Sequence, residues 1–156
     1  MIEVRTAGPA DLPEIIRMYR RLEREMVDLH EMWPLADGID EPIDLSIGAR
    51  IESGEWFVYV ATIDSVPLGF LFAHLRSLLE QAQGERVGVI DLLFTEPEAR
   101  EVGIAEALLD VALADLARAG AERFDAPVLP GHRLAKNFFE RAGFSARSIT
   151  MHRRKR

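Results

Sequence analysis

The stretch Arg100-Glu101-Val102-Gly103-Ile104-Ala105, which runs directly into Glu106-Ala107-Leu108-Leu109, decides the architecture of this chain. It follows an apolar run from Val87 to Phe94 and opens a segment of helical periodicity. A strand, a turn and a new helix together favour an anion site, because the first N–H groups of a helix have no partner and the helix dipole is positive there. Gly103 has no Cβ to keep a phosphate away, and Ala105 keeps the next turn slim.

Outward from this turn, apolar periodicity predicts an α/β chain. Runs rich in aromatic and β-branched residues favour strands, and apolar spacings of three and four residues favour helices. We expect strands at residues 2–5, 56–63, 66–75 and 87–94, helices over 12–29, 44–53 and 104–120, and then a short strand, a helix ending at Gly143 and a last strand. Because no repeat, low-complexity segment or linker interrupts this order, we expect one domain over residues 1–156.

The first long helix carries two further features. Asp11 and Glu14 predict a capping box at its start, and Pro13 is tolerated in the first turn. Four arginines, at positions 17, 20, 21 and 24, lie mostly off the apolar stripe. We interpret them as a solvated face without a function.

A second block lies near the end of the chain, Ala135-Lys136-Asn137-Phe138-Phe139-Glu140-Arg141-Ala142-Gly143-Phe144. The Arg-x-x-Gly-x-Ala pattern at residues 100–105 resembles the pyrophosphate-binding signature of the GNAT superfamily of acyl-CoA-dependent N-acetyltransferases, and the second block resembles that family's second signature. Two blocks in the right order are more specific than either alone. The resemblance implies a mixed, largely antiparallel sheet flanked by helices.

The resemblance also implies how acetyl-CoA would bind. Its pyrophosphate would lie on the backbone of Arg100, Glu101, Val102, Gly103, Ile104 and Ala105. In this family the preceding strand splays from its neighbour and binds the pantetheine arm, which here implies the backbone of Leu93, Phe94 and Thr95. A backbone N–H there would also stabilise the oxyanion that forms during attack on the thioester.

Asp91 stands out in the strand before the turn, because it lies between Ile90 and Leu92 in a run otherwise suited to burial. Burial of a lone carboxylate raises its pKa, and such a group is suited to taking a proton from an ammonium substrate. An acidic residue is frequent at this position in the family, so Asp91 is our candidate catalytic residue. The alternatives are a pair with an arginine, or exposure at the open end of the sheet.

Two positions depart from the family pattern. Phe139 stands where the family often has a Tyr that protonates the departing thiolate, and a phenyl ring cannot donate a proton. A thiolate is, however, a fair leaving group by itself, since a thiol pKa is about 8.5. His132 stands where the family usually has Asn, and we interpret it as a contact to the coenzyme, because imidazole both donates and accepts hydrogen bonds. The alternative for His132 is a helix-start residue without a ligand role.

The acceptor side has weaker signals. Residues 30–44 contain five acidic residues and no Lys or Arg, and in GNAT folds this loop borders the acceptor cleft. An acidic wall suits a cationic amine, although a solvated loop in an acidic protein explains the composition equally well. Trp33 and Trp56 could frame the acceptor, and plain packing is the alternative.

Composition excludes several classes of function. A net charge of −7 argues against general binding to nucleic acid or to an anionic membrane. The chain has no cysteine, which excludes a disulfide and a thiol nucleophile, and its four histidines lack metal-ligand spacing, so we expect no metal. No signal peptide and no membrane-spanning run is seen, and we expect a cytoplasmic location.

The resemblance implies an acetyl-CoA-dependent N-acetyltransferase that moves an acetyl group directly, in a ternary complex, to a primary amine of a small molecule or protein. The alternative is a non-catalytic module that senses or sequesters acyl-CoA, which Phe139 and His132 keep open. The sequence does not name the acceptor and does not fix the oligomeric state, for which a homodimer is one possibility.

Overall fold

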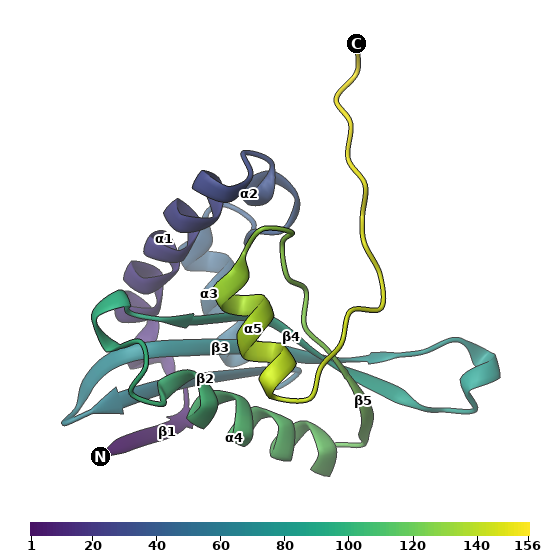
Figure 1. Ribbon diagram of the computed structural model, residues 1–156. Helices are drawn as coiled ribbons and strands as arrows, with labels where there is room; N and C mark the ends of the chain where they lie inside the picture. Colours follow the sequence, from purple (N-terminus) through teal and green to yellow (C-terminus); the bar gives the residue numbers. More distant parts are fainter.

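The computed structural model describes residues 1–156 and contains one five-stranded sheet in the order β1-β2-β3-β4-β5 (Figure 1). The strands are β1 (Ile2–Thr6), β2 (Trp56–Ile63), β3 (Val66–Ser77), β4 (Arg86–Thr95) and β5 (Ala121–Asp125). The first four strands pair antiparallel to their neighbours, and β5 pairs parallel to β4. The sheet is therefore mixed and largely antiparallel, as predicted.

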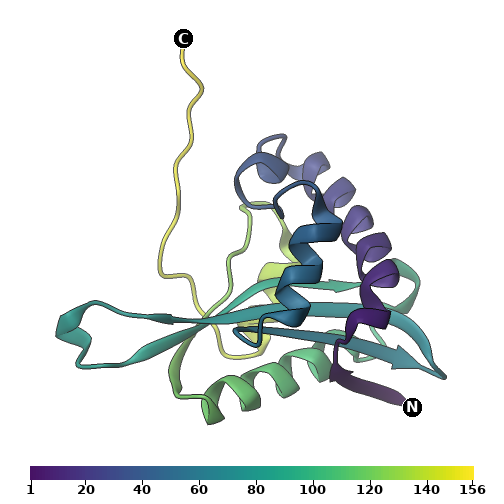
Figure 2. The same ribbon diagram turned by 180° about the vertical axis from the view of Figure 1, so that it is seen from behind.

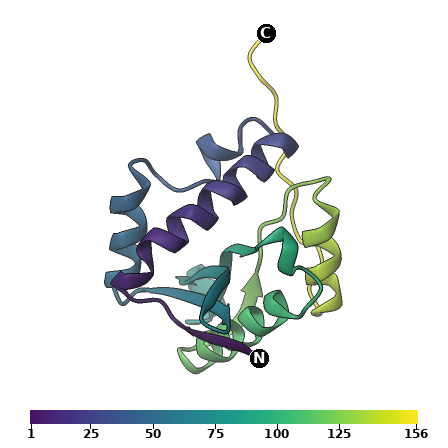
Figure 3. The same ribbon diagram turned by 90° about the vertical axis from the view of Figure 1, so that its left-hand side faces the viewer.

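Helices cover both faces of this sheet (Figures 2 and 3). They are α1 (Leu12–Leu29), α2 (Trp33–Ala36), α3 (Ile43–Glu52), α4 (Ile104–Arg118) and α5 (Arg133–Arg141), with short 3₁₀ turns η1 (Pro9–Asp11), η2 (Glu80–Ala82) and η3 (Pro97–Ala99). The helices α1 and α3 lie on one face, and α4 lies on the other. No helix of the structure has the length and hydrophobicity of a membrane-spanning segment.

Two hydrophobic cores follow from this arrangement. Successive side chains of a strand point to opposite faces, so Val58 and Val60 of β2 pack under α1 and α3, while Tyr59 and Ala61 pack against α4. Both faces are buried, which explains why the central strands read as nearly continuous apolar runs instead of alternating ones.

The strand β4 has an irregularity at Asp91. Its neighbour Leu92 is opposite Phe72 of β3, and Ile90 is opposite Ala73, so no residue of β3 lies opposite Asp91 in the strand register. Such a β-bulge re-aims side chains, and it brings Asp91 toward the face that also carries Leu92. On its other edge β4 pairs with β5 only from Arg86 to Val89. The rest of that edge, residues 90–95, has no neighbouring strand.

The expectation of a last strand after Gly143 is wrong. Residues 145–156 form no backbone hydrogen bond and extend away from the body of the molecule (Figure 1). Arg147 pairs with Asp125 of β5 at 2.8 Å and holds the root of this tail. Beyond it only Ile149 and Met151 are large and apolar, and the last four residues are all basic. Ordering this tail would therefore bury too little apolar surface to offset the loss of conformational entropy.

The capping box expected at α1 is also wrong. Asp11 precedes the helix, but its carboxylate accepts a hydrogen bond from the N–H of Gly8 at 2.8 Å and pairs with Arg5 at 2.6 Å. An arginine on the adjacent strand competes better for this carboxylate than the N–H groups of the helix do, because the pair is charged on both sides.

Candidate active site

The turn before α4 presents a run of unpaired backbone donors. The first backbone hydrogen bond of the helix runs from Ala107 N–H to the carbonyl of Gly103, at 3.0 Å. The N–H groups of Glu101 to Glu106 have no hydrogen-bond acceptor in the chain, whereas Arg100 N–H is directed to the carbonyl of Pro97 at 3.4 Å. The turn therefore offers donors to a ligand from five of the six residues predicted for this role, and also from Glu106.

Gly103 is selected by backbone conformation more than by internal space. Its φ is +95°, a region that residues with a Cβ rarely adopt. A Cβ at this position would meet only the carboxylate of Glu106 at 3.5 Å and the Cδ1 atom of Ile2 at 3.6 Å, which are ordinary contacts. The protein itself thus leaves the space beside Gly103 open.

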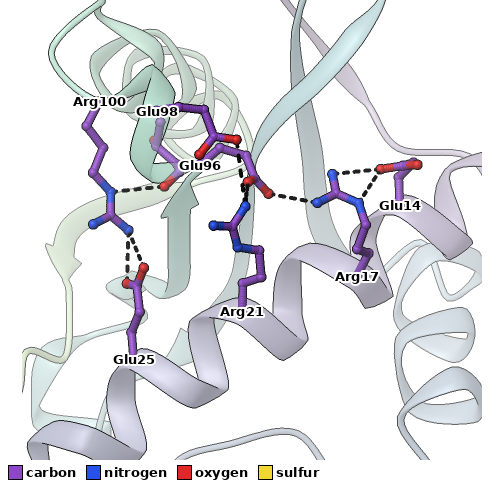
Figure 4. A network of polar contacts seen from close by, with 8 residues as sticks. Glu14, Arg17, Arg21, Glu25, Glu96, Glu98 and Arg100 are labelled. Carbon is purple, nitrogen blue, oxygen red and sulfur yellow. Dashed lines mark hydrogen bonds and ion pairs between the residues drawn. The ribbon is translucent and has the colours of Figure 1, made fainter.

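Ion pairs attach this turn to α1 (Figure 4). Arg100 donates from Nε to the carbonyl of Thr95 at 3.0 Å and contacts both carboxylate oxygens of Glu25 at 2.9 Å. Its side chain is committed to the fold, so a contribution of Arg100 to ligand binding would have to come from its backbone.

The centre of this network is Glu96, whose side chain is only 2% exposed. It pairs with Arg17 at 3.1 Å and with Arg21, while Arg17 also contacts the exposed Glu14 at 2.8 Å (Figure 4). The interpretation of the four α1 arginines as a solvated face without a function is wrong for Arg17 and Arg21, because these two neutralise a carboxylate buried at the end of β4.

The residues predicted for the pantetheine arm, Leu93 to Thr95, lie on the unpaired edge of β4. Phe94 and Thr95 are buried, and Leu93 is partly exposed. The hydroxyl of Thr95 is buried without a hydrogen-bond partner. A backbone edge with no neighbouring strand, next to an unsatisfied hydroxyl, is compatible with an extended polar ligand running along it.

Asp91 forms a pair with His74 of β3, through a contact of 2.7 Å between Oδ2 and Nδ1. Its side chain is 24% exposed, and burial raises the pKa of this carboxyl above its usual range, although His74 and the more distant Arg50 oppose the shift. Neither alternative given by the sequence describes Asp91, because its partner is a histidine instead of an arginine and because it is not freely exposed. The contact through Nδ1 leaves Nε2 of His74 available as a proton acceptor.

An aromatic stack continues from this pair. The ring of Trp56 lies 4.9 Å from the His74 ring, and the guanidinium of Arg50 lies 4.0 Å from the centroid of Trp56. Sequence reasoning missed His74 and Arg50. Pairing the runs 66–75 and 87–94 as a hairpin could have placed His74 near Asp91, whereas no sequence signal pointed to Arg50.

The two residues that depart from the family pattern are found in different surroundings. His132 is half-buried at the start of α5, and burial lowers its pKa, with a smaller raising effect from Glu25 and a lowering effect from Arg100. It therefore lies near the ion pair that holds the turn. Phe139 is 8% exposed and packs edge-on between Phe138 and Phe144. Contacts of either residue with a coenzyme stay predictions.

Two residues of the acidic loop between α1 and α3 make contacts that stabilise the fold. Glu41 pairs with Arg20 at 2.8 Å, and Trp33 is 5% exposed and packs against Tyr19. For Trp33 the packing alternative is therefore correct. No group of three or more histidine and acidic side chains is arranged to hold a metal ion.

Residues 14–144 match the Acetyltransferase (GNAT) family, and the chain belongs to this family. The predictions of a GNAT fold and of an acetyltransferase are confirmed. No curated protein matches the chain.

Solved structures of the same fold cover almost the whole chain. A transcriptional regulator from Bacillus halodurans C-125 is 20% identical with a TM-score of 0.78, over 97% of this chain and 99% of its own. The aminoglycoside N-acetyltransferase AAC(6')-Iy, in complex with a bisubstrate analogue of CoA, is 19% identical with a TM-score of 0.74, over 100% of this chain and 99% of its own. A ribosomal-protein-alanine N-acetyltransferase from Brucella melitensis biovar Abortus 2308 is 19% identical with a TM-score of 0.70, over 99% of both chains.

Proposed function

We propose that the protein is an acetyl-CoA-dependent N-acetyltransferase that transfers the acetyl group directly to a primary amine in a ternary complex. The observation that carries the proposal is the juxtaposition along β4 of the Asp91–His74 pair, the unpaired strand edge and the unpaired N–H groups that open α4. Along β4 they follow the order of the groups that they would serve. The Asp91–His74 pair would accept the proton of the amine, the strand edge would bind the pantetheine arm, and the N–H groups would bind the pyrophosphate.

The residues of the turn fit the pyrophosphate of coenzyme A. The N–H groups of Glu101 to Glu106 lack partners, and the positive end of the α4 dipole favours an anion. Leu93 to Thr95 would hold the pantetheine arm through their backbone, with His132 and Phe139 as further contacts. Acetyl-CoA supplies the acetyl group as an activated thioester.

The chain's own part in the chemistry is to manage a proton and to position the acceptor. The Asp91–His74 pair would take the proton from the acceptor ammonium, so that the nitrogen lone pair becomes free to attack. With Nδ1 of His74 held by Asp91, the accepting atom would be Nε2. Phe139 offers no proton to the leaving sulfur, which would depart as the thiolate.

The alternative function is a non-catalytic module that binds acyl-CoA. Phe139 favours it, because a phenyl ring replaces the usual proton donor. A CoA-release assay with acetyl-CoA and a panel of amines separates the two functions. Release that depends on an amine supports the enzyme, whereas tight binding of acetyl-CoA without release supports the module.

A cytoplasmic location remains part of the proposal.

The coenzyme site can be tested at Gly103. We expect Gly103→Asn to weaken CoA binding by at least tenfold, because asparagine tolerates a positive φ but adds a side chain beside the unpaired N–H groups. Calorimetry with CoA measures the effect. The matched control is Gly84→Asn, at a φ of +88°, where an added Cβ would meet no other atom within 4 Å. Equal CoA affinity in Gly103→Asn and wild type would contradict the proposed site.

A further inference from the structure

Arg50 has an unusual environment for an arginine. Its guanidinium lies 4.0 Å from the centroid of Trp56 and 5.7 Å from that of Phe72, and its side chain forms no hydrogen bond and no ion pair. Burial lowers its pKa. By contrast, Arg17, Arg20 and Arg21 on the neighbouring helix α1 each pair with a glutamate.

The surroundings of Arg50 fix its position without satisfying its donors. The cation–π contact with the indole of Trp56 holds the guanidinium in place. Asp91 and Asp40 act on Arg50 at longer range, but neither comes within ion-pair distance. A guanidinium carries five N–H donors in a planar fork that matches the two oxygens of a carboxylate. The cluster therefore presents a guanidinium that is held against Trp56 and free to bind an anion.

This guanidinium lies beside the proposed proton acceptor. The indole of Trp56 contacts Arg50 at 4.0 Å, and its ring lies 4.9 Å from that of His74, which in turn contacts Asp91. One small molecule can therefore place an ammonium group at the His74–Asp91 pair and an anionic group at Arg50. A polycationic or neutral acceptor would leave the guanidinium without a partner.

We propose that Arg50 is a specificity-determining residue that binds the carboxylate of the acceptor, so that the substrate class is small amines carrying a carboxylate, such as free amino acids. The inference rests on the proposed N-acetyltransferase function. A carboxylate is favoured over a phosphate because a single cation faces the site and both Asp40 and Asp91 repel a second negative charge.

The test compares matched acceptors with wild type and Arg50→Met. Glycine, β-alanine and 4-aminobutyrate are paired with methylamine, ethylamine and propylamine, and the common amino acids are paired with their amides. We expect wild type to favour the carboxylated member in kcat/KM by about 10- to 100-fold, the range for one charged hydrogen-bonded contact. Arg50→Met should lose this preference within each pair, and the ratio is the readout because loss of the Arg50 charge also raises the pKa of Asp91 for every acceptor.

Matched controls separate recognition from folding. Methionine keeps an unbranched stem against Trp56, and the melting temperature of Arg50→Met should stay near that of wild type. Arg50→Lys keeps the charge without the fork, and we expect it to retain part of the preference. Arg24→Met removes an exposed α1 arginine that has no ion pair, and it should leave all ratios unchanged.

The outcomes distinguish this inference from the function on which it rests. Acetylation of amines with no carboxylate preference, or a preference that survives in Arg50→Met, overturns the role of Arg50 and leaves the acetyltransferase intact. A preference for 2-aminoethyl phosphate over β-alanine overturns the carboxylate in favour of phosphate. If no amine is acetylated, the proposed function fails, and calorimetry with the same amino acids in the presence of CoA decides the inference. Binding to wild type but not to Arg50→Met supports it, and no binding overturns it.

Discussion

At the scale of single residues, the active-site chemistry depends on one extra residue in β4. Without the bulge at Asp91, strict alternation would give Asp91 and Leu92 opposite faces. With it, the Asp91 carboxylate meets His74 on the face covered by α1 and α3. The raised pKa of Asp91 follows from its burial there, and it suits a group that must both accept and release a proton.

We expect Asp91→Asn to lower turnover by about 10²-fold or more, the usual contribution of a general base. Because the pKa of Asp91 is raised, wild-type turnover should fall as pH drops through a range above that of an ordinary aspartate, since protonation of Asp91 removes the negative charge that supports proton transfer to Nε2 of His74. The variant should lack this limb and should improve only as the amine loses its own proton at higher pH. Turnover from pH 4 to 10 measures the effect.

CoA affinity provides the control for this prediction, and it should be nearly unchanged in Asp91→Asn. A second control is Asp110→Asn, which changes an exposed carboxylate on α4. A variant at position 91 with the turnover of wild type at every pH would show that Asp91 has a structural role only.

Residue-level prediction from sequence succeeded where a single position was conspicuous and failed where two distant positions had to meet. Asp91 was visible because a charge interrupted an apolar strand. His74 and Arg50 were not, because their roles depend on the register between β3 and β4 and on the docking of α3 over β2. The periodicity of one segment does not show which residue of β3 lies beside Asp91, and it does not show where α3 docks on β2.

At the scale of elements, the turn before α4 is held by more than its own sequence. The 3₁₀ turn η3 and the start of α4 follow Glu96, and this buried carboxylate is neutralised from α1 by Arg17 and Arg21. The long helix thus fixes the end of β4, and with it the position of the unpaired N–H groups. Helix periodicity predicted α1 and α4 separately, but a charged face looks the same in sequence whether it meets water or a buried glutamate.

Glu96→Gln should destabilise the protein by about 1–3 kcal/mol, because two arginines lose a charged partner while the amide keeps part of the hydrogen bonding. CoA affinity should fall as well, since the turn loses an anchor. Urea unfolding and calorimetry measure the two effects. The matched control is Glu14→Gln, an exposed partner of the same Arg17, which should cost less than about 1 kcal/mol. Equal effects of the two substitutions would contradict the anchoring role of Glu96.

At the scale of the whole molecule, the layered architecture could be predicted because both faces of the sheet are buried. Continuous apolar strands require cover on both sides, and the helical segments before and after the central strands supply it. The tail was mispredicted because its residues alternate acceptably for a strand, whereas strand formation also needs a partner edge and enough apolar area. The small apolar area can be read from the sequence of the tail, but the absence of a partner edge cannot.

Deletion of residues 148–156 should leave the melting temperature within about 2 °C of wild type, because removal of exposed, unpaired residues costs little. Ile149 and Met151 are 72% and 88% exposed, and the deletion retains the Arg147–Asp125 pair. Deletion from residue 147 is the matched variant, and it should cost less than about 1 kcal/mol more, as expected for an exposed ion pair. Calorimetric melts at two protein concentrations, tenfold apart, measure both. A loss of more than 5 °C at both concentrations would show that the tail packs on its own chain, whereas a loss that grows with concentration in comparison with wild type would show that it pairs with a second copy.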